Sequence, residues 1–135
     1  MSELLADLFS IESDFTPDLE KQVRGLRMLI TDPSGSSGVF VAVIDKRIIG
    51  MATVQTLIST AEGGRVGLVE DVIVHRLFRR AGAGSLLIDR IIAWGRGKGL
   101  KRLQLLADQG NHQALNFYSS RGWTTTRLIC LRNNL

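Results

Sequence analysis

The sequence contains few of the residues that build disulfide bridges or metal sites. Among its 135 residues are a single cysteine, Cys130, and two histidines, His75 and His112. One cysteine cannot form an internal disulfide, which fits a reducing compartment. Two isolated histidines and one cysteine do not make a metal site either. We therefore expect no bound metal, and we interpret Cys130, on an apolar C-terminal segment, as a packing residue.

Long hydrophobic runs are also lacking. No stretch approaches the ~18 consecutive apolar residues of a membrane span. The N-terminal "MSELLADLFSIESDF" is acidic and has no positively charged start of a signal peptide. We expect a cytoplasmic protein with no membrane partner. A hydrophobic content of 44% over this length is typical of one globular domain, residues 1–135.

Aromatic residues make up only 6% of the chain, which argues against a nucleic-acid partner despite a net charge of +4 and a pI of about 9.8. Such binders need a base-reading helix or stacking aromatic side chains. The densest basic cluster is Arg76, Arg79 and Arg80. Because it adjoins a glycine-rich loop, it indicates a local anion site.

The first part of the chain has helical periodicity, from about Ser2 to Thr31. The spacing of Leu4, Leu5, Leu8 and Phe9 predicts one apolar helix face. A second helix is predicted to begin at Thr16-Pro17, with proline at the first helical position. The composition of residues 32–38, "DPSGSSG", predicts a loop.

The pattern then changes to that of strands. "VFVAVID", "IIGMATVQTLIST" and "VGLVEDVIV" are separated by short turns, which predicts an antiparallel meander. A helix from Ser85 to about Lys98 should lead into a strand within "LKRLQLLAD", parallel to Val69–Val74. A helix closed by Gly122 and a last strand from about Thr124 to Arg132 complete the expectation. The predicted fold class is α/β (α+β) with a mixed central sheet and helices on both faces.

Between the third strand and the next helix lies "RRAGAG", Arg79 to Gly84. A helix N-terminus offers unpaired N–H groups and a positive dipole end, and both favour phosphate binding. The dinucleotide fingerprint fails because Leu87 stands where its third small residue belongs. The Walker pattern fails because the only Gly-Lys pair, Gly97-Lys98, is followed by Gly99.

What remains is R-x-x-G-x-G, formed by Arg79, Gly82 and Gly84. It resembles the acyl-CoA pyrophosphate loop of the GNAT N-acetyltransferase superfamily. Val69–Val74 looks like that family's central strand. "NHQALNFY", Asn111 to Tyr118, followed by "RGW", is similar to its second signature. The resemblance covers about residues 39–132 and the two leading helices. It implies transfer of an acetyl group from acetyl-CoA, as co-substrate, to a primary amine by direct attack.

The resemblance also assigns cofactor-binding residues. Successive N–H groups from Arg80 to Ser85 would face the pyrophosphate, the backbone of Val72–Val74 would pair with the pantetheine arm, and Asn111 would hydrogen-bond that arm. The alternatives are a glycine-rich connection without ligand, core residues, and a helix N-cap, respectively. The full set is Val72, Ile73, Val74, Arg79, Arg80, Ala81, Gly82, Ala83, Gly84, Ser85 and Asn111.

Two residues are candidates for proton transfer. Tyr118 matches the family's tyrosine near the thioester sulfur, where a phenol can protonate the departing thiolate; the alternative is a core aromatic. Glu70 is the candidate base, and strand alternation would place it on one face with Val72 and Val74, with Asp71 on the other. Burial would raise its pKa. The alternatives are a structural or substrate-binding carboxylate, with water as the base.

The acceptor stays open among a small amine, an amino acid and a protein N-terminus. Its pocket would be built by the leading helices, residues 59–64 and the C-terminal strands. An alternative function of another class is a catalytically silent CoA-binding regulatory or interaction module.

One departure from the family pattern concerns the start of the sheet. Members usually begin with a strand, whereas "SELLADLF" has helical spacing, so the first family strand is expected to be missing. Val39–Asp45 would then be a sheet edge with unpaired backbone groups, and such edges tend to be covered. We expect a homodimer that pairs this edge, or an N-terminal helix that screens it.

Overall fold

The computed structural model describes residues 1–10 and 16–135. The chain forms two compact units, Met1–Leu105 and Leu106–Leu135, and each is described by itself.

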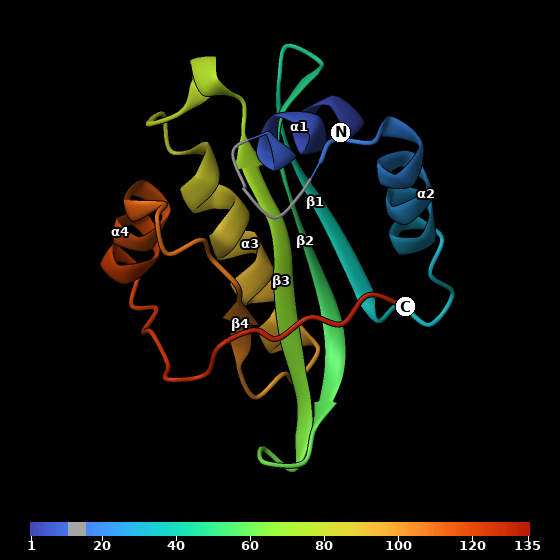
Figure 1. The fold of residues 1–135 in the computed structure, drawn as a ribbon, viewed down its shortest axis with the longest axis vertical. Coiled ribbons are helices and arrows are strands. Elements are labelled where there is room, and N and C mark those ends of the chain that lie inside the picture. Colours follow the sequence, from blue (N-terminus) through green and yellow to red (C-terminus); the bar gives the residue numbers. More distant parts are fainter. Residues whose placement is uncertain (11–15) are drawn as a thin grey trace. The chain divides into compact units, whose positions relative to one another are not determined.

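The first unit is built on a four-stranded sheet of order β1-β2-β3-β4 (Figure 1). The strands are β1 (Ser37–Ile44), β2 (Arg47–Ser59), β3 (Gly64–Val74) and β4 (Leu103–Leu105). The first three are antiparallel neighbours, and β4 is parallel to β3. The meander and the parallel αβ unit expected from the sequence are confirmed. Among the described residues, β1 lies at an edge of this sheet.

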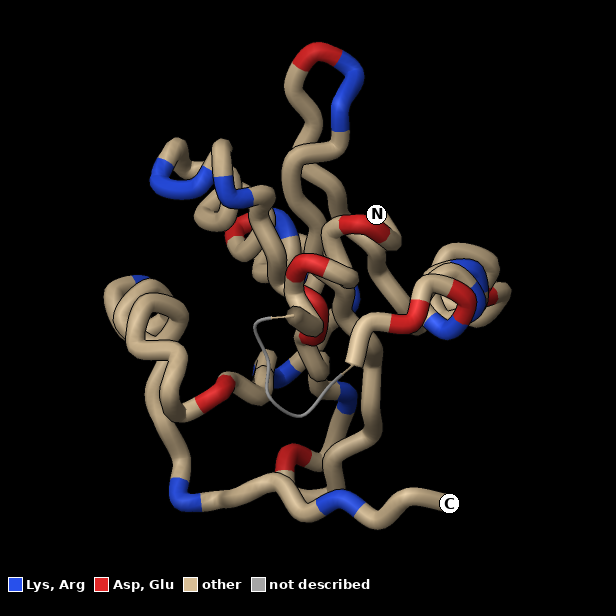
Figure 2. The backbone as a smooth tube through the Cα atoms, turned by 45° about the horizontal axis from the view of Figure 1, so that its top comes forward, with Lys and Arg blue, Asp and Glu red and all other residues tan. Residues whose placement is uncertain are grey.

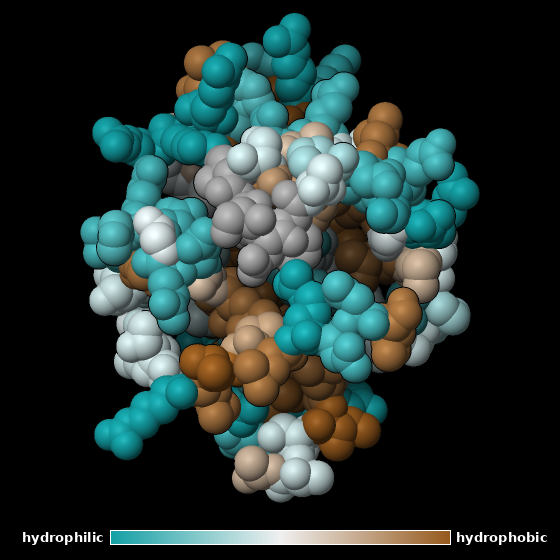
Figure 3. Space-filling model, in the orientation of Figure 1, coloured by the Kyte–Doolittle hydropathy of each residue, from teal (hydrophilic) through white to brown (hydrophobic). Residues whose placement is uncertain are grey.

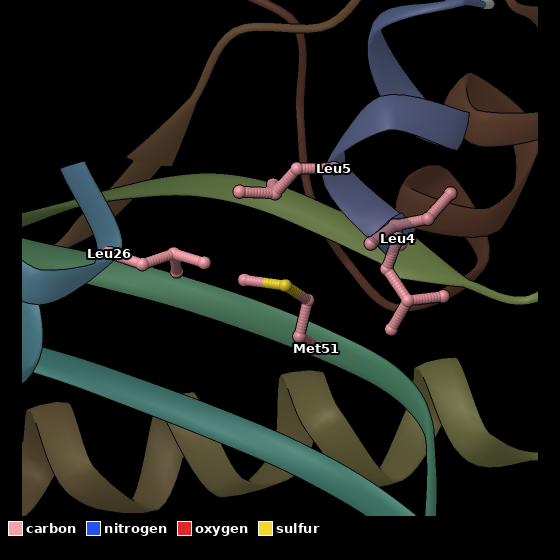
Figure 4. Packing of buried hydrophobic residues seen from close by; sticks show 5 residues of the cluster. Leu4, Leu5, Leu26 and Met51 are labelled. Carbon is pink, nitrogen blue, oxygen red and sulfur yellow. The ribbon is translucent and has the colours of Figure 1, made fainter. Parts of the chain in front are cut away.

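Helices α1 (Ser2–Phe9) and α2 (Leu19–Ile30) pack on one face of this sheet, and α3 (Ala83–Gly97) packs on the other (Figure 1). On the first face, Leu4 and Leu5 of α1 and Leu26 of α2 meet Met51 of β2 and Ile73 of β3 (Figure 4). On the second face the α3 side chains are also buried, led by Ile88 and Ile91. Trp94 of α3 packs edge-on against Phe40 of β1, with ring centroids 6.3 Å apart.

Helix α2 begins at Leu19, two residues after Pro17, which was expected to be the first helical residue. Asp18 is the N-cap, and its Oδ1 accepts a hydrogen bond from the backbone N–H of Lys21 at 3.1 Å. Pro17 therefore precedes the cap and is not the first helical residue. A capping carboxylate satisfies an N–H that the first turn leaves unpaired, which explains why Asp18 sets the boundary.

The start of β1 is held by a carboxylate. Asp32 Oδ1 accepts hydrogen bonds from the backbone N–H and the hydroxyl of Ser34, at 3.0 and 2.6 Å. Its Oδ2 accepts from the N–H of Ser37, the first residue of β1, at 2.9 Å. These donors stabilise the charged form and lower the pKa of Asp32 from 3.8 to about 2.

Strand β3 contains a β-bulge close to its C-terminal end. Thr53 of β2 lies opposite Glu70, whereas Met51, two residues away, lies opposite Ile73, three residues on. One extra residue is thus inserted into β3. Asp71 absorbs it with a left-handed backbone, φ 49°. A bulge of this kind shifts the alternation of side chains between the two faces of a strand.

The pairing of β3 with β4 is short. Gly67–Val69 of β3 pair with Leu103–Leu105, so the strand expected within "LKRLQLLAD" covers only its central residues. Gly67 permits this approach, because a Cβ on it would lie 2.5 Å from Cδ2 of Leu103.

The second unit contains helix α4 (His112–Ser120), which is followed by Gly122 with a φ of 81°. The strand expected from about Thr124 to Arg132 was wrong: residues 124–132 form no strand. Their apolar pattern suits a strand, but a strand exists only where a neighbouring backbone pairs with it. Leu128, Ile129 and Leu131 are accordingly exposed.

No helix within residues 1–10 and 16–135 has the length and apolar character needed to cross a membrane. Hydrophobic side chains nevertheless reach the surface in several places (Figure 3). In the first unit they include Val43 at the sheet edge and Ile58 near the end of β2.

Candidate active site

The glycine loop joins the end of β3 to the start of α3. A short 3-10 helix, η1 (Arg76–Phe78), comes first, and His75 caps it by accepting a hydrogen bond at Nδ1 from the N–H of Leu77, 3.3 Å away. Arg80 and Gly82 then take left-handed backbones, with φ of 64° and 87°. Figure 2 shows the basic residues of this segment beside the helix start. The chain thus turns into α3 through two left-handed residues.

Within residues 1–10 and 16–135, no side chain caps the N-terminus of helix α3. Gly82 is the N-cap residue, and the helix runs for 15 residues from Ala83. The first N–H groups of such a helix have no carbonyl partner within it, and the helix dipole adds positive potential there. This is the local chemistry that binds phosphate.

The space around Gly82 fits a large anion. A Cβ built on Gly82 meets no atom within 4 Å, and residues 79–82 are exposed. Glycine is therefore required here by its left-handed φ and not by crowding from the protein. An open, positive helix end next to Arg79 and Arg80 is compatible with the pyrophosphate of CoA.

Arg79 is engaged with the protein itself. Its Nε donates a hydrogen bond to the carbonyl oxygen of Val74 at 3.0 Å. That carbonyl belongs to the segment Val72–Val74, whose backbone was expected to pair with the pantetheine arm. The arginine therefore links the two parts of the expected cofactor site in the first unit.

The carboxylates of Glu70 and Asp71 lie on the same face of the sheet, which corrects the sequence expectation. Glu70 Oε2 accepts a hydrogen bond from Gln55 Nε2 at 3.2 Å, and Asp71 Oδ2 accepts one from Thr53 Oγ1 at 3.0 Å. Thr53 and Gln55 are two residues apart on β2 and share a face. The expectation of opposite faces assumed a regular strand, and the bulge at Asp71 breaks that alternation.

The same bulge changes the residues with which Glu70 shares its face. Met51 and Thr53 are two apart on β2, and they lie opposite Ile73 and Glu70. Glu70 therefore shares its face with Ile73, and not with Val72 and Val74 as expected.

The surroundings raise the pKa of both carboxyl groups. For Glu70 the largest cause is partial desolvation and the second is the negative charge of Asp71, while the hydrogen bond from Gln55 acts in the opposite direction. Burial raises the pKa of Asp71, and the hydrogen bond from Thr53 partly offsets this. The residue Glu70 is exposed overall rather than buried, so water still reaches it.

Asn111 and Tyr118 belong to the second unit. Asn111 is the N-cap of α4, where its Oδ1 accepts a hydrogen bond from the N–H of Ala114 at 3.0 Å. The ring of Tyr118 packs against Phe117 and Trp123, with centroids 5.2 and 5.7 Å away. The N-cap role considered from the sequence is thus present, whereas Tyr118 makes ring contacts but is only partly buried and is not a core residue.

The structure gathers Glu70, Val72–Val74 and Arg79–Ser85 in the first unit, and it places Asn111 and Tyr118 in the second. Sequence reasoning missed the side-chain pair of Asp71 and Thr53. The adjacent acids "ED" were the available signal, but a bulge leaves no reliable mark in one sequence.

Two further features lie outside the expected cofactor site: the cysteine Cys130 and a groove beside the leading helices. Cys130 is exposed, so its interpretation as a packing residue was wrong; it lies in the C-terminal segment that forms no strand. A groove of about 340 Å³ lies between α1 and α2, lined in part by Met1, Val23 and Ile30. It is lined by the leading helices that were expected to help build the acceptor pocket, but it contains none of the expected catalytic or cofactor-binding residues, so we do not assign it to the chemistry.

Taken together, an antiparallel meander, a parallel αβ unit and a helix preceded by Gly82 define an α/β protein in which the third strand leads, through η1 and a glycine loop, to the N-terminus of α3. Comparison with known proteins agrees: residues 3–123 match the model of the acetyltransferase (GNAT) family. The chain belongs to this family.

The match to an individual relative covers a smaller part of the chain than the match to the family. An uncharacterized N-acetyltransferase, ycf52-like, of Prochlorococcus marinus is 35% identical over 54 residues, which are 40% of this chain and 28% of that protein. The match thus spans little more than a quarter of the relative's length.

Solved structures share the fold over nearly the whole chain. An aminoglycoside acetyltransferase from an uncultured soil metagenomic sample superposes with a TM-score of 0.79 at 23% identity, covering 98% of this chain and 84% of that one. An acetyltransferase of Trypanosoma brucei gives a TM-score of 0.74 at 25% identity, covering 99% and 89%.

Proposed function

We propose that this chain transfers an acetyl group from acetyl-CoA to a primary amine. The observation that carries the proposal is the N-terminus of α3, where Gly82 has a φ of 87° and open space around it. An anionic cofactor fits this helix end, and membership of the acetyltransferase family supports CoA as its identity.

In this proposal each part of the first unit has a separate task. The N–H groups from Arg80 to Ser85 hold the pyrophosphate, because a helix end attracts anions and a left-handed glycine keeps the approach open. The backbone of Val72–Val74 pairs with the pantetheine arm. Arg79 fixes the relation between these two segments through its bond to the Val74 carbonyl.

The chemical step is a direct acyl transfer. Acetyl-CoA supplies an activated carbonyl, and the amine nitrogen attacks it after losing its extra proton to Glu70. Backbone N–H groups of β3 stabilise the negative oxygen of the tetrahedral intermediate. As the intermediate collapses, the C–S bond breaks, the nitrogen releases its second proton to solvent, and Tyr118 donates a proton to the leaving thiolate. The products are an N-acetylated amine and free CoA.

The acceptor that we propose is a small molecule or peptide carrying a primary amine. An amine is mostly protonated at neutral pH, so a site with two nearby carboxylates favours its approach by charge. The structural likeness to an aminoglycoside acetyltransferase adds support for small amines as the first compounds to test.

The direct test measures thiol release with acetyl-CoA against a panel of polyamines, amino sugars, amino acids and peptide N-termini. We expect turnover with at least one class, together with loss of about 10² in rate for Glu70→Gln, as for general-base assistance. Asp45→Asn, at the exposed β1–β2 turn, is the charge-matched control. If CoA binds by calorimetry but every amine stays unreacted, the chain is instead a CoA-binding module without turnover.

We also propose that a second copy covers the edge strand β1. Its support is the position of β1 at the edge of the described sheet and the exposure of Val41, Val43 and Ile44. Light scattering tests this. A strict monomer whose β1 amides exchange freely with deuterium would contradict it.

A further inference from the structure

The bulge in β3 creates a carboxylate pair that a regular strand could not form. In a regular strand Glu70 and Asp71 would point to opposite faces. Here the backbone of Asp71 has a φ of 49°, a value that residues other than glycine, asparagine and aspartate seldom adopt. The two acids consequently bond neighbouring side chains of one β2 face, Thr53 and Gln55.

The two members of the pair are held differently. Asp71 is half-buried, and its partner Thr53 has no exposed surface, so its carboxylate is fixed against the core. Glu70 is exposed, and among the described residues Gln55 is its hydrogen-bond partner. The charge of Asp71 is fixed and the carboxylate of Glu70 is accessible. This arrangement suits a role for Asp71 in adjusting the pKa of Glu70.

We propose that Asp71 is a positioning residue that acts through Glu70, its fixed negative charge making Glu70 a better proton acceptor for the incoming amine. This inference rests on the proposed function, and it goes beyond it by giving Asp71 a task. The bulge then has a second consequence: the extra residue places the carboxylate of Asp71 on the same sheet face as Glu70, the proposed base.

Electrostatics agree with the direction of this effect. Two adjacent negative charges disfavour each other's ionised form, and the charge of Asp71 indeed raises the pKa of Glu70. A base whose pKa lies nearer the working pH takes a proton from an amine more effectively. The side chains of β2 that bond the pair, Thr53 and Gln55, are neutral and add no competing charge.

Other charged groups on elements packed against β3 are exposed in the described part of the chain, and none of them contributes to the shift at Glu70. These groups are Glu3 and Asp7 on α1, Arg47 on β2, Asp89, Arg90 and Arg96 on α3, and Arg102 before β4. The charge of Asp71 is therefore the one to remove.

The key variant is Asp71→Asn, which removes the charge but keeps an oxygen for Thr53 and a residue that tolerates a left-handed backbone. Its matched control is Asp45→Asn, because Asp45 also has a left-handed φ, 46°, and is exposed in a turn away from the pair. Circular dichroism and calorimetric binding of acetyl-CoA establish that both variants fold and bind the cofactor.

Two measurements decide the matter. The first follows the Glu70 carboxyl carbon by NMR during a pH titration. The second records kcat/KM against pH with an amine found in the screen. In Asp71→Asn we expect the Glu70 titration and the acid limb of the profile to move together to lower pH. We expect the maximal rate to fall by roughly 10-fold, less than for loss of the base itself. Asp45→Asn should leave both unchanged.

The outcomes are distinguishable from failure of the proposed function. If the Glu70 titration is unchanged in Asp71→Asn, the charge of Asp71 does not act on Glu70, and the proposal is overturned whatever the activity. A shifted titration with an unchanged pH–rate profile overturns the role in catalysis. If the wild-type protein acetylates no amine, the proposed function fails and the positioning role fails with it. Joint movement of the titration and the profile supports both.

Discussion

Arg79 donates a hydrogen bond from Nε to the carbonyl oxygen of Val74, 3.0 Å away, and so joins the loop before α3 to the last residue of β3. Arg79→Lys keeps the charge but removes this planar donor. We expect acetyl-CoA affinity to fall about fivefold, which corresponds to the ~1 kcal/mol of a typical hydrogen bond. Calorimetry at two salt concentrations checks this. Arg76→Lys, in η1, is the control, and an equal loss there would indicate a general charge effect.

Gly82→Val should weaken acetyl-CoA binding while the fold persists. Its Cβ meets no protein atom within 4 Å, so the cost comes from the left-handed φ and from the space taken from the ligand. The backbone strain is about 1–2 kcal/mol. Gly63→Val is a matched control, because Gly63 has a φ of 59°, open space around it and a place in the β2–β3 turn. Unchanged affinity in folded Gly82→Val would exclude the loop as the pyrophosphate site.

Tyr118→Phe should lower turnover by about 10² and leave acetyl-CoA affinity nearly unchanged, because only the proton donor is lost. The ring contacts with Phe117 and Trp123 are retained, so the melting temperature should stay close to that of the wild type. Steady-state kinetics and calorimetry on one preparation separate the two effects. A fully active variant would leave Tyr118 with packing as its role.

Asn111 combines an observed role with a proposed one, and two substitutions separate them. Asn111→Ala removes the acceptor for Ala114 N–H and should cost about 1 kcal/mol of unfolding free energy. Asn111→Ser keeps a capping oxygen but lacks the amide donor. We expect Asn111→Ser to be nearly as stable as the wild type and to bind acetyl-CoA more weakly. Equal affinity would limit Asn111 to its capping role.

Asp32 should make stability depend on pH in the acid range. Its pKa is lowered from 3.8 to about 2 by hydrogen bonds from Ser34 and Ser37, so folding favours the charged form. This contribution is fully present above pH 3.8 and is lost as pH falls through about 2. Asp32→Ala should therefore be less stable at pH 7, and the difference should shrink towards pH 2. Urea denaturation at several pH values measures it, with exposed Asp7→Ala as the control.

Sequence patterns predicted the helices and strands well wherever their position depends on residues close together in the chain. The turns after Ile44 and Ser59 are rich in polar or glycine residues, and α3 carries its apolar residues at helical spacing. These features depend on neighbours in the chain, so one sequence contains them. The glycine-rich segment was also located correctly after the third strand, but α3 begins at Ala83, two residues before the expected Ser85, so Ala83 and Gly84 belong to the helix.

Features that depend on pairing between distant segments were not predictable in this way. The bulge at Asp71 exists only in relation to the register of β2, and it reverses which residues share a face with Glu70. The segment after Thr124 has a strand-like composition, but composition does not show whether a neighbouring backbone pairs with it. The roles of Glu70, Asn111 and Tyr118 came from a family resemblance, and they stay predictions until the variants are measured.

The three-residue pairing of β3 with β4 has a consequence for the order of folding. Strands β1 to β3 join through short turns, so their contacts form between residues close in sequence and at low cost in chain entropy. Gly67 and Leu103 must instead close a loop that contains the bulge, η1 and all of α3. We expect the meander to acquire amide protection first in pulsed hydrogen exchange, and the Gly67–Val69 amides that face β4 to follow. The N-terminal end of α3, where we propose that the cofactor pyrophosphate binds, would then be assembled late, on a sheet that has already formed.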